Sequence, residues 1–247
     1  ILDKLPEKPK SAIILGSGLG EFCLMLRGII RIPYTDVPFY PTSSIEGHAG
    51  EWVFGYINKK PVICASGRFH HYEGFTLEQI ALPVLVTYAL GCRTLFITNA
   101  SGCVNLKWQL GDLMLIQGYL DYSFLESTDI PPIVLLKKND FLYNKLENSA
   151  LDINIKLRKG IYTWTLGPSY ETPAEIQDII LKGGNAVGMS TVPELKKAQE
   201  LGMDVIGISC LTNYGAGLMN EPLTHKAILD STRKMKRKFI TLMKKII

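Results

Sequence analysis

The sequence predicts a single α/β domain, built on a central mixed and largely parallel β-sheet that is flanked by helices. Short apolar runs recur along the chain, and each ends in glycine, asparagine, serine or threonine. Segments with helical periodicity lie between several of these runs, which is the pattern of buried strands alternating with helices. Neither a repeat nor a break in composition divides the 247 residues, so residues 1–247 are expected to form one domain.

The apolar runs have the length and the residue types of buried strands. The expected strands cover residues 11–18, 52–57, 61–67, 94–102, 112–118, 160–167, 185–190 and 204–213. In an open α/β sheet, ligands bind beyond the carboxyl ends of the strands. Polar residues that end these runs are therefore expected to converge on one edge of the sheet. They are Ser17, Arg68, Asn99, Ser190 and Asn213.

Helical periodicity marks residues 75–91, 172–184, 191–202 and the C-terminal segment from Leu223. At the start of the third segment, Thr191 and Glu194 have the spacing of a capping box. The C-terminal segment is expected to be an amphipathic surface helix with a solvated basic face. Its apolar face would consist of Met235, Phe239, Ile240, Met243 and Ile247. Residues 119–158 are the least regular part and predict a loop followed by a helix around residues 140–150.

Composition and charge exclude several classes of protein. Hydrophobic residues make up 47% of the chain, and the net charge of +4 is too small to indicate a nucleic-acid-binding protein. No apolar run approaches the length of a membrane span, so no membrane role is expected. The five cysteines are scattered and lack CxxC spacing, which predicts buried, reduced thiols in a cytoplasmic protein.

Residues 16–20, GSGLG, follow an expected strand and are expected to open a helix. Glycines there let backbone N–H groups and the Ser17 hydroxyl approach an anion. Glu21 stands where the dinucleotide-binding fingerprint needs a glycine, and the P-loop lysine is absent, which disfavours a dinucleotide-binding domain. Taken alone, the motif indicates a phosphate-binding turn and a purely structural tight turn about equally.

Residues 67–74, GRFHHYEG, gather five polar or aromatic side chains between two glycines. If the segment continues the strand before it, alternation places Arg68, His70 and Tyr72 on one face and turns His71 to the other. Adjacent histidines in an extended segment do not readily share a metal ion, so a metal centre is disfavoured. Arg68 and His70 together suit an anion, although a polar surface turn is about equally compatible with these residue types.

A set of motifs extends over nearly the whole chain, except for roughly residues 119–158. They are GSGLG (16–20), EGHAGEWVFG (46–55), GRFHHYEG (67–74), TNASGCVN (98–105), GDLMLI (111–116), GPSYETPAEI (167–176), NAVGMSTVPE (185–194) and SCLTN (209–213). In this order and at these spacings, they resemble the trimeric, low-molecular-mass purine nucleoside phosphorylases, a family that includes the methylthioadenosine phosphorylases.

The resemblance implies reversible phosphorolysis, in which a purine ribonucleoside or 2′-deoxyribonucleoside reacts with phosphate. The products are the free base and (deoxy)ribose 1-phosphate. The resemblance also implies inorganic phosphate as co-substrate, no metal or organic cofactor, and a homotrimer.

Carried over motif by motif, the resemblance implies three groups of site residues. Phosphate would contact Ser17, His48, Arg68, His70, Ser190 and the backbone N–H of Ala100. Ribose would contact Tyr72, Met189 and His225, the last at the 5′-hydroxyl. The base would contact Tyr170, Glu171, Val187 and Asn213. Of these residues, Asn213, Glu171 and His70 are expected to act in catalysis.

The implied chemistry suits these residue types. The glycosidic bond breaks through an oxocarbenium-like state, with positive charge on the sugar and negative charge on the departing purine. A phosphate dianion held by fixed donors stabilises the cation and captures it, so no protein nucleophile is needed. Asn213 can hydrogen-bond N7 and O6 of the purine, and Glu171 can accept the N1 proton of a 6-oxopurine. Adenine has no proton at N1, so inosine and guanosine are expected over adenosine.

The sequence departs from the family near residue 119. Tyr119 stands where relatives usually carry a histidine, and the loop that follows is shorter than usual. In relatives this region lends an aromatic side chain across the trimer interface, and Tyr122 and Phe124 are the candidates here. Tyr214 occupies a variable position and is expected to adjust base preference.

Two other functions stay open from the sequence. One is a methylthioadenosine phosphorylase, which usually presents aspartate at the position of Asn213. The other is a non-catalytic purine nucleoside binder whose short loop fails to close. Single residues also have structural alternatives. Asn99 and Asn213 could form turns, Met189 and Tyr170 could pack in the core, Ser190 could cap a helix, and His225 could start one.

Overall fold

The structure, a computed structural model, describes residues 1–43, 49–127, 129, 131–219 and 225–247, and for residues 225–231 it describes the backbone alone. Among these residues, one ten-stranded sheet has the order β10-β6-β8-β9-β5-β1-β4-β3-β2, with β7 beside β6. The strands are β1 (Ser11–Leu15), β2 (Arg27–Pro33), β3 (Glu51–Ile57), β4 (Lys60–Ser66), β5 (Thr94–Cys103), β6 (Leu113–Asp121), β7 (Val134–Leu135), β8 (Leu157–Trp164), β9 (Ala186–Gly188) and β10 (Asp204–Tyr214).

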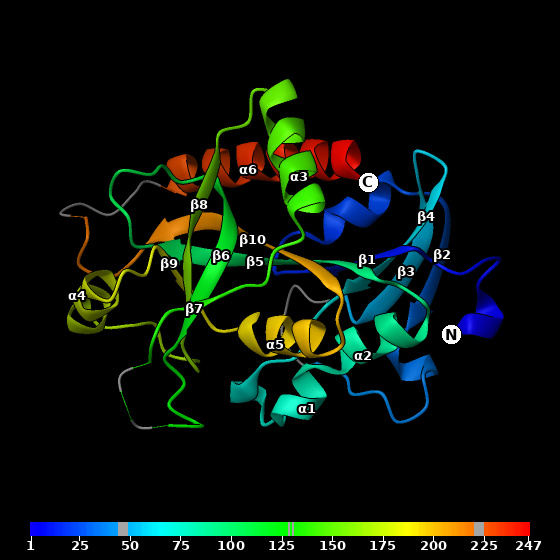
Figure 1. Ribbon diagram of the computed structural model, residues 1–247, viewed down its shortest axis with the longest axis horizontal. Helices are drawn as coiled ribbons and strands as arrows, with labels where there is room; N and C mark the ends of the chain where they lie inside the picture. Colours follow the sequence, from blue (N-terminus) through cyan, green and yellow to red (C-terminus); the bar gives the residue numbers. More distant parts are fainter. Residues whose placement is uncertain (44–48, 128, 130, 220–224) are drawn as a thin grey trace.

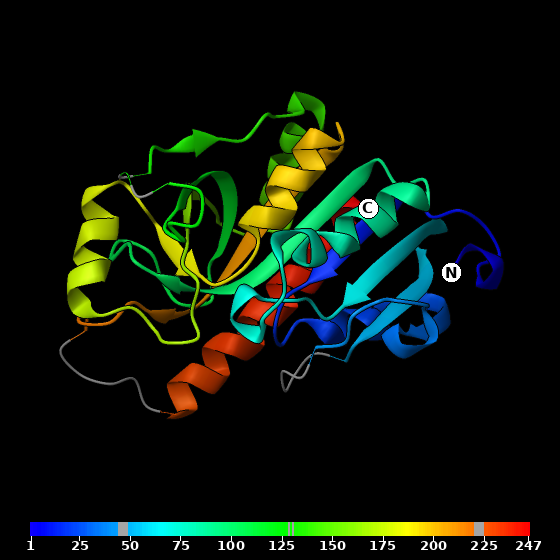
Figure 2. The ribbon, with the colours of Figure 1, turned by 90° about the horizontal axis from the view of Figure 1, so that it is seen from below.

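Helices cover both faces of this sheet. The α-helices are α1 (Leu77–Ile80), α2 (Leu82–Ala89), α3 (Asp140–Asp152), α4 (Pro173–Leu181), α5 (Val192–Glu200) and α6 (His225–Ile246). Helices α3 and α6 lie on one face, and α1, α2 and α5 lie on the other (Figures 1 and 2). The mixed α/β fold that the alternating pattern predicts is therefore confirmed.

The pairing of the strands explains where a site can form. Strand β10 pairs with both β6 and β5, so β5, β9, β8, β6 and β10 close into a ring. Strands β4, β1, β5 and β10 are parallel to one another. Their carboxyl ends consequently meet at one edge, which is where ligands bind in α/β sheets.

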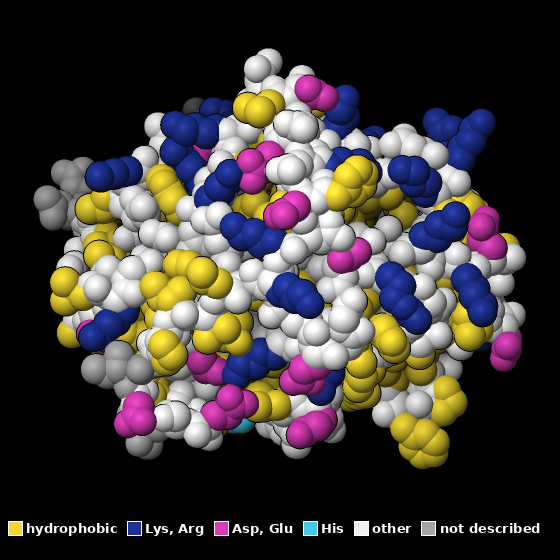
Figure 3. Space-filling view, in the orientation of Figure 1, with side chains coloured by type: hydrophobic (Ala, Val, Ile, Leu, Met, Phe, Trp, Pro, Cys, Tyr) yellow, Lys and Arg dark blue, Asp and Glu magenta, His cyan; other side chains and the backbone are white. Residues whose placement is uncertain are grey.

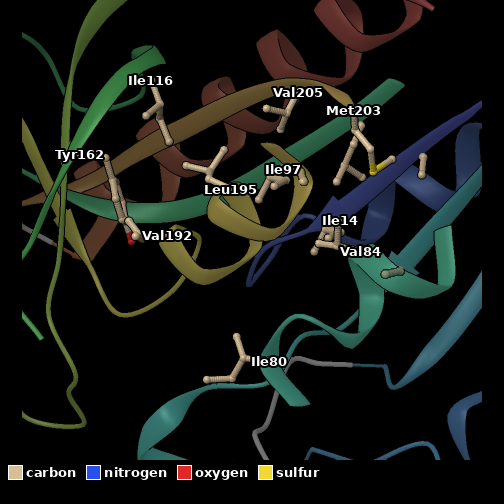
Figure 4. Close-up of a cluster of buried hydrophobic side chains, with 14 of the residues drawn as sticks. Ile14, Ile80, Val84, Ile97, Ile116, Tyr162, Val192, Leu195, Met203 and Val205 are labelled. Atoms are coloured by element: carbon tan, nitrogen blue, oxygen red, sulfur yellow. The ribbon is translucent and has the colours of Figure 1, made fainter. Parts of the chain in front are cut away.

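Alternation along the strands produces two separate cores. On β1, Ile14 packs into one cluster with Ile97, Val84 and Leu195, which Figure 4 shows between the sheet and helices α2 and α5. Its neighbour Ile13 packs into the other cluster, on the α3 and α6 side. The predicted apolar face of the C-terminal helix is confirmed. Met235, Phe239, Met243 and Ile247 are buried there, and Ile240 packs beside them.

The expected strands all occur, with ends shifted by a few residues. Strands β2 and β7 were not predicted, because β2 is largely exposed and β7 has only two residues. The expected helix over 75–91 divides at Ala81, and Pro83 lies in the first turn of α2. Helix α3 confirms the helix predicted around residues 140–150. None of the helices in the described part of the chain could cross a lipid bilayer.

Candidate active site

A cavity of about 470 Å³ opens at the carboxyl ends of β1, β5, β9 and β10. Of the predicted site residues, Ser17, Arg68, His70, Tyr72, Ala100, Tyr170, Glu171, Val187, Met189, Ser190 and Asn213 line it. Asn99 lines it too, so the predicted convergence of the strand-end residues is confirmed. His48 lies outside the described residues, and of His225, at the start of α6, only the backbone is described. The contributions of these two histidines stay predictions.

The GSGLG segment forms a tight turn against β5. A side chain at Gly16 would place its Cβ atom 2.6 Å from the Cα atom of Asn99, so only glycine fits there. The Gly16 N–H donates to the Thr98 hydroxyl at 3.2 Å. The turn therefore holds Ser17 against the cavity. It continues into a short 3₁₀ helix, η2 (Gly20–Met25), rather than an α-helix, so any helix dipole there is short.

Arg68 is buried, and its guanidinium is held by fixed acceptors. Its Nε and Nη2 groups donate to the two carboxylate oxygens of Glu194 at 3.2 and 3.1 Å. Nη1 donates to the Thr98 carbonyl at 2.7 Å and to the Ser190 hydroxyl at 3.3 Å. Burial raises the pKa of the Glu194 carboxyl, while the charge of Arg68 acts in the opposite direction. The pair fixes the guanidinium in one orientation beside the cavity.

The expected capping box at Thr191 and Glu194 is only half formed. Among the described residues, the Thr191 side chain makes no capping hydrogen bond. The Glu194 carboxylate does interact with the Thr191 backbone, but its two oxygens also accept from Arg68. Thr191 has φ of +82°, and the Val192 N–H donates to the Ser190 carbonyl at 3.0 Å, which makes residues 190–192 a γ-turn. Such a conformation is strained for a β-branched residue.

Side-chain hydrogen bonds hold this γ-turn in place. The Asn99 amide donates to the Thr191 hydroxyl at 2.9 Å, and the Ser190 and Thr191 hydroxyls lie 3.1 Å apart. Asn99 and Thr191 are both buried. The turn thereby fixes Ser190 on the cavity wall, next to the Nη1 group of Arg68.

The interpretation of residues 67–74 is half right. Arg68, His70 and Tyr72 line the cavity and His71 does not. The reason is not strand alternation, because β4 ends at Ser66 and residues 71–73 form a 3₁₀ turn. The His70 N–H and Nδ1 both lie 2.9 Å from one oxygen of Glu73. The His70 ring stacks on Tyr72, with centroids 4.8 Å apart. Burial, with the nearby Arg68 charge, lowers the pKa of His70.

Asn213 reaches the cavity through a β-bulge. Strand β10 runs in register with β5 as far as Leu211, and Thr212 is then the extra residue before Asn213. The Thr212 hydroxyl lies 3.0 Å from Oδ1 of Asn213, and Nδ2 donates to the Tyr214 carbonyl at 3.2 Å. The Tyr214 hydroxyl donates to the Trp108 carbonyl at 2.9 Å, so its ring is also fixed.

Glu171 faces the cavity from the loop between β8 and α4. The Thr165 hydroxyl donates to Oε1 of Glu171 at 2.7 Å. The next residue, Thr172, is the N-cap of α4 and forms a capping box with Glu175. Tyr170 is 80% exposed, so the suggestion that it packs in the core is wrong. Val187 and Met189 come from β9 and the residue after it.

Several residues at the site were missed from the sequence. They are Glu194, Glu73, Thr165 and Thr212, which bind Arg68, His70, Glu171 and Asn213 respectively. Only the first carried a usable signal, because a buried arginine needs an acidic partner. Within the described residues, no group of three or more histidine, cysteine, aspartate or glutamate side chains is arranged to hold a metal ion.

Comparisons with known proteins agree along the whole chain. A family model described as "Phosphorylase superfamily" matches residues 10–247. Purine nucleoside phosphorylase 1 of Geobacillus stearothermophilus is 41% identical over 254 residues, which cover 99% of this chain and 93% of that protein. Purine nucleoside phosphorylase 1 of Bacillus subtilis (strain 168) is 41% identical over 261 residues, with coverages of 100% and 94%.

Two solved structures have the same fold. One is described as a schistosoma purine nucleoside phosphorylase in complex with hypoxanthine, with a TM-score of 0.84 and 29% identity. The other is described as Schistosoma mansoni purine nucleoside phosphorylase in complex with adenosine, with a TM-score of 0.85 and 29% identity. Each match covers 98% of this chain and 91% of the other.

Proposed function

The chain belongs to the phosphorylase superfamily, among its purine nucleoside phosphorylases, and from this premise we propose that it phosphorolyses 6-oxopurine nucleosides. The substrates are inosine, guanosine and their 2′-deoxy forms, and the products are the free base and (deoxy)ribose 1-phosphate. The observation that carries the proposal is that the Glu171 carboxylate and the Asn213 amide both lie on the wall of one cavity. Similar solved proteins are described with hypoxanthine and with adenosine, so the base preference rests on these two side chains.

Base recognition follows from the donors and acceptors of the two residues. A 6-oxopurine carries a proton at N1 and an acceptor at O6. Glu171 accepts the N1 proton, and Asn213 donates to O6 and bonds N7, more strongly as negative charge builds on the base. A fixed donor of this kind typically contributes about 3 kcal/mol in a transition state. Adenine would set its N1 lone pair against the carboxylate, which leaves both acceptors unpaired.

Phosphate binds at the opposite end of the cavity. The Ser17 and Ser190 hydroxyls, the Ala100 N–H, Arg68, His70 and His48 form the proposed phosphate site. Glu194 holds Nε and Nη2 of Arg68, and Nη1 donates to the Thr98 carbonyl and the Ser190 hydroxyl, so Arg68 serves the proposed phosphate site through its fixed positive charge and by holding Ser190. The bound dianion stabilises the oxocarbenium-like sugar and then bonds to its anomeric carbon, while the purine leaves with the electron pair of the glycosidic bond.

Ribose lies between these two ends. Tyr72 stacks on His70, and Met189 approaches the loop that carries Glu171, since a side chain at Gly167 would come within 2.4 Å of its sulfur. These two residues form the proposed ribose wall, with His225 at the 5′-hydroxyl. No metal or organic cofactor takes part in the proposed reaction. Activity is therefore expected to survive a metal chelator and to require added phosphate.

A homotrimer is part of the proposal. Figure 3 shows apolar side chains gathered on the side of the molecule that carries β7 and α4. Leu135 and Leu181 are 69% and 82% exposed there, and β7 is an edge strand. Phe124 is exposed, whereas Tyr122 is bound to Asp178 of its own chain at 2.7 Å, which makes Phe124 the better candidate to reach a neighbouring site.

Light scattering tests the assembly. The wild-type protein should have three times the mass of one chain, and Leu135→Lys should lower that mass. Leu151→Lys, at a similarly exposed leucine of α3, is the matched control. A monomeric wild type would contradict the trimer.

The five cysteines are all buried and free, which supports the cytoplasmic location that we propose. Fractionation of the source cells tests this location.

Incubation with inosine, adenosine or methylthioadenosine, with and without phosphate, tests the function. Hypoxanthine and ribose 1-phosphate should appear from inosine only when phosphate is present, and faster than adenine appears from adenosine. Release at equal rates without phosphate would indicate a hydrolase. A preference for methylthioadenosine would identify the alternative phosphorylase, and binding without release would identify a non-catalytic binder.

A further inference from the structure

Thr165 forms a hydrogen bond with the carboxylate of Glu171, the residue proposed to bind the purine base. Its hydroxyl donates to Oε1 of Glu171 at 2.7 Å, a well-formed O–H···O hydrogen bond. Thr165 itself is fixed on the sheet, because it follows β8 directly and its N–H donates to the Gly188 carbonyl at 3.0 Å. Gly188 ends β9, the strand whose Val187 lines the base end of the cavity.

Glu171 is fixed at two points as a result. Its backbone precedes Thr172, whose capping box with Glu175 starts α4. Its side chain is fixed by Thr165, and within the described part of the chain the second oxygen, Oε2, carries no hydrogen bond. Glu171 lines the cavity, but Thr165 does not. The Thr165 hydroxyl is therefore placed to influence a ligand through Glu171.

We propose that Thr165 is a positioning residue that sets base selectivity by holding Glu171 as an oriented carboxylate acceptor. Because the hydroxyl donates to Oε1, it holds the carboxylate in place and leaves Oε2 as the oxygen that can accept the N1–H of a 6-oxopurine. Without the hydroxyl, the carboxylate loses this contact, so its free oxygen is no longer held in position for the N1–H of a 6-oxopurine. The inference deepens the proposed function and rests on it.

Two substitutions separate this role from packing. Thr165→Val keeps the branched shape and removes the hydroxyl, while Thr165→Ser keeps the hydroxyl and removes a methyl group. A hydrogen bond to a charged group is worth about a tenfold effect. Thr165→Val should therefore lower kcat/KM for inosine about tenfold and leave adenosine nearly unchanged, so that the inosine/adenosine ratio falls about tenfold. Thr165→Ser should keep the wild-type ratio.

The double variant Thr165→Val, Glu171→Gln shows whether the effect passes through the carboxylate. If it does, Thr165→Val has little further effect on the inosine/adenosine ratio once Glu171 is glutamine. Equal losses for both nucleosides, a Thr165→Ser variant that behaves like Thr165→Val, or additive effects in the double variant would each overturn the proposal.

Calorimetry with free bases distinguishes failure of this inference from failure of the proposed function. If the wild type does not release hypoxanthine from inosine in the presence of phosphate, the proposed function fails. The role of Thr165 is then decided by binding alone: Thr165→Val should weaken hypoxanthine about tenfold and leave adenine unchanged. The same affinity of wild type and variant for hypoxanthine would overturn it.

Discussion

Both carboxylate oxygens of Glu194 hold the guanidinium of Arg68, one at Nε and the other at Nη2, and both side chains are almost completely buried. The pair connects the segment after β4 to the first turn of α5. The ion pair therefore contributes both to the stability of the fold and to the position of Arg68 at the proposed phosphate site. A buried charge without its partner is costly, so each residue depends on the other.

Glu194→Ala should lower the free energy of unfolding by about 3–5 kcal/mol, because it leaves the Arg68 charge buried and unpaired. Urea denaturation measures this loss. The variant should also raise the KM for phosphate, since Arg68 is then free to change orientation. Glu200→Ala is the control on the same helix, where Glu200 is exposed and bonds Lys197. It should cost about 0–1 kcal/mol, and equal losses from the two variants would contradict the role given to Glu194.

The pH dependence of stability should reveal His70. Its pKa lies below the ordinary value of 6.5, because burial and Arg68 disfavour the charged ring. The unfolded chain takes up this proton at higher pH than the folded chain does. The contribution of His70 is therefore complete above about pH 6.5 and is lost as the pH falls toward the lowered pKa. The free energy of unfolding of wild type should fall more steeply than that of His70→Gln between pH 7.5 and 5.5.

Glu73 provides the check on this interpretation. Its hydrogen bond and its charge both raise the pKa of His70, against the effect of burial. Glu73→Gln should lower that pKa further and extend the loss of stability to lower pH. Parallel curves for wild type and His70→Gln would show that another group causes the dependence.

The parts of the fold that the sequence predicts are those with a repeated local signal. Strand β1 and the first half of β5 have their apolar side chains in the two cores, so they are visible as apolar runs. Strand β2 is mostly exposed at the sheet edge and lacks that signal. The closure of the ring through β10 and β5 has no local signal either, because it joins residues more than a hundred positions apart.

The same distinction applies to the candidate site. Ser17 and Arg68 follow strands and Asn213 lies near the end of β10, so their convergence can be predicted from strand ends alone. The partner of Arg68 lies 126 positions away, and the TVPE pattern around Glu194 has a competing local interpretation as a capping box. The positive φ of Thr191 could not be predicted, since a β-branched residue disfavours it and only the surrounding hydrogen bonds stabilise it.

Two glycines of the GSGLG turn should respond very differently to alanine. At Gly16 the new methyl group would lie 2.6 Å from the Asn99 Cα atom and 2.8 Å from the Thr98 carbonyl oxygen, which are backbone atoms that cannot move aside. Gly16→Ala should lower the free energy of unfolding by about 1–3 kcal/mol and weaken phosphate binding through Ser17. At Gly20 the nearest atom is the Ser66 hydroxyl at 3.4 Å, so Gly20→Ala should cost much less. Thermal denaturation and the KM for phosphate measure both effects, and similar losses would contradict the packing of Gly16.

Asn213→Asp should move base preference toward 6-aminopurines. The amide Nδ2 can donate to O6 of a 6-oxopurine, whereas a carboxylate can only accept, and a 6-amino group offers it a proton. The Thr212 hydroxyl can still donate to Oδ1 in the variant, so the side chain should keep its place on the bulge. Removing the matched donor should lower the inosine/adenosine ratio of kcat/KM by about tenfold or more. Asn105→Asp is the control, because Asn105 accepts a backbone N–H from Lys107 and does not line the cavity. An unchanged ratio in Asn213→Asp would remove Asn213 from base recognition and leave Glu171 as the residue that distinguishes the two bases.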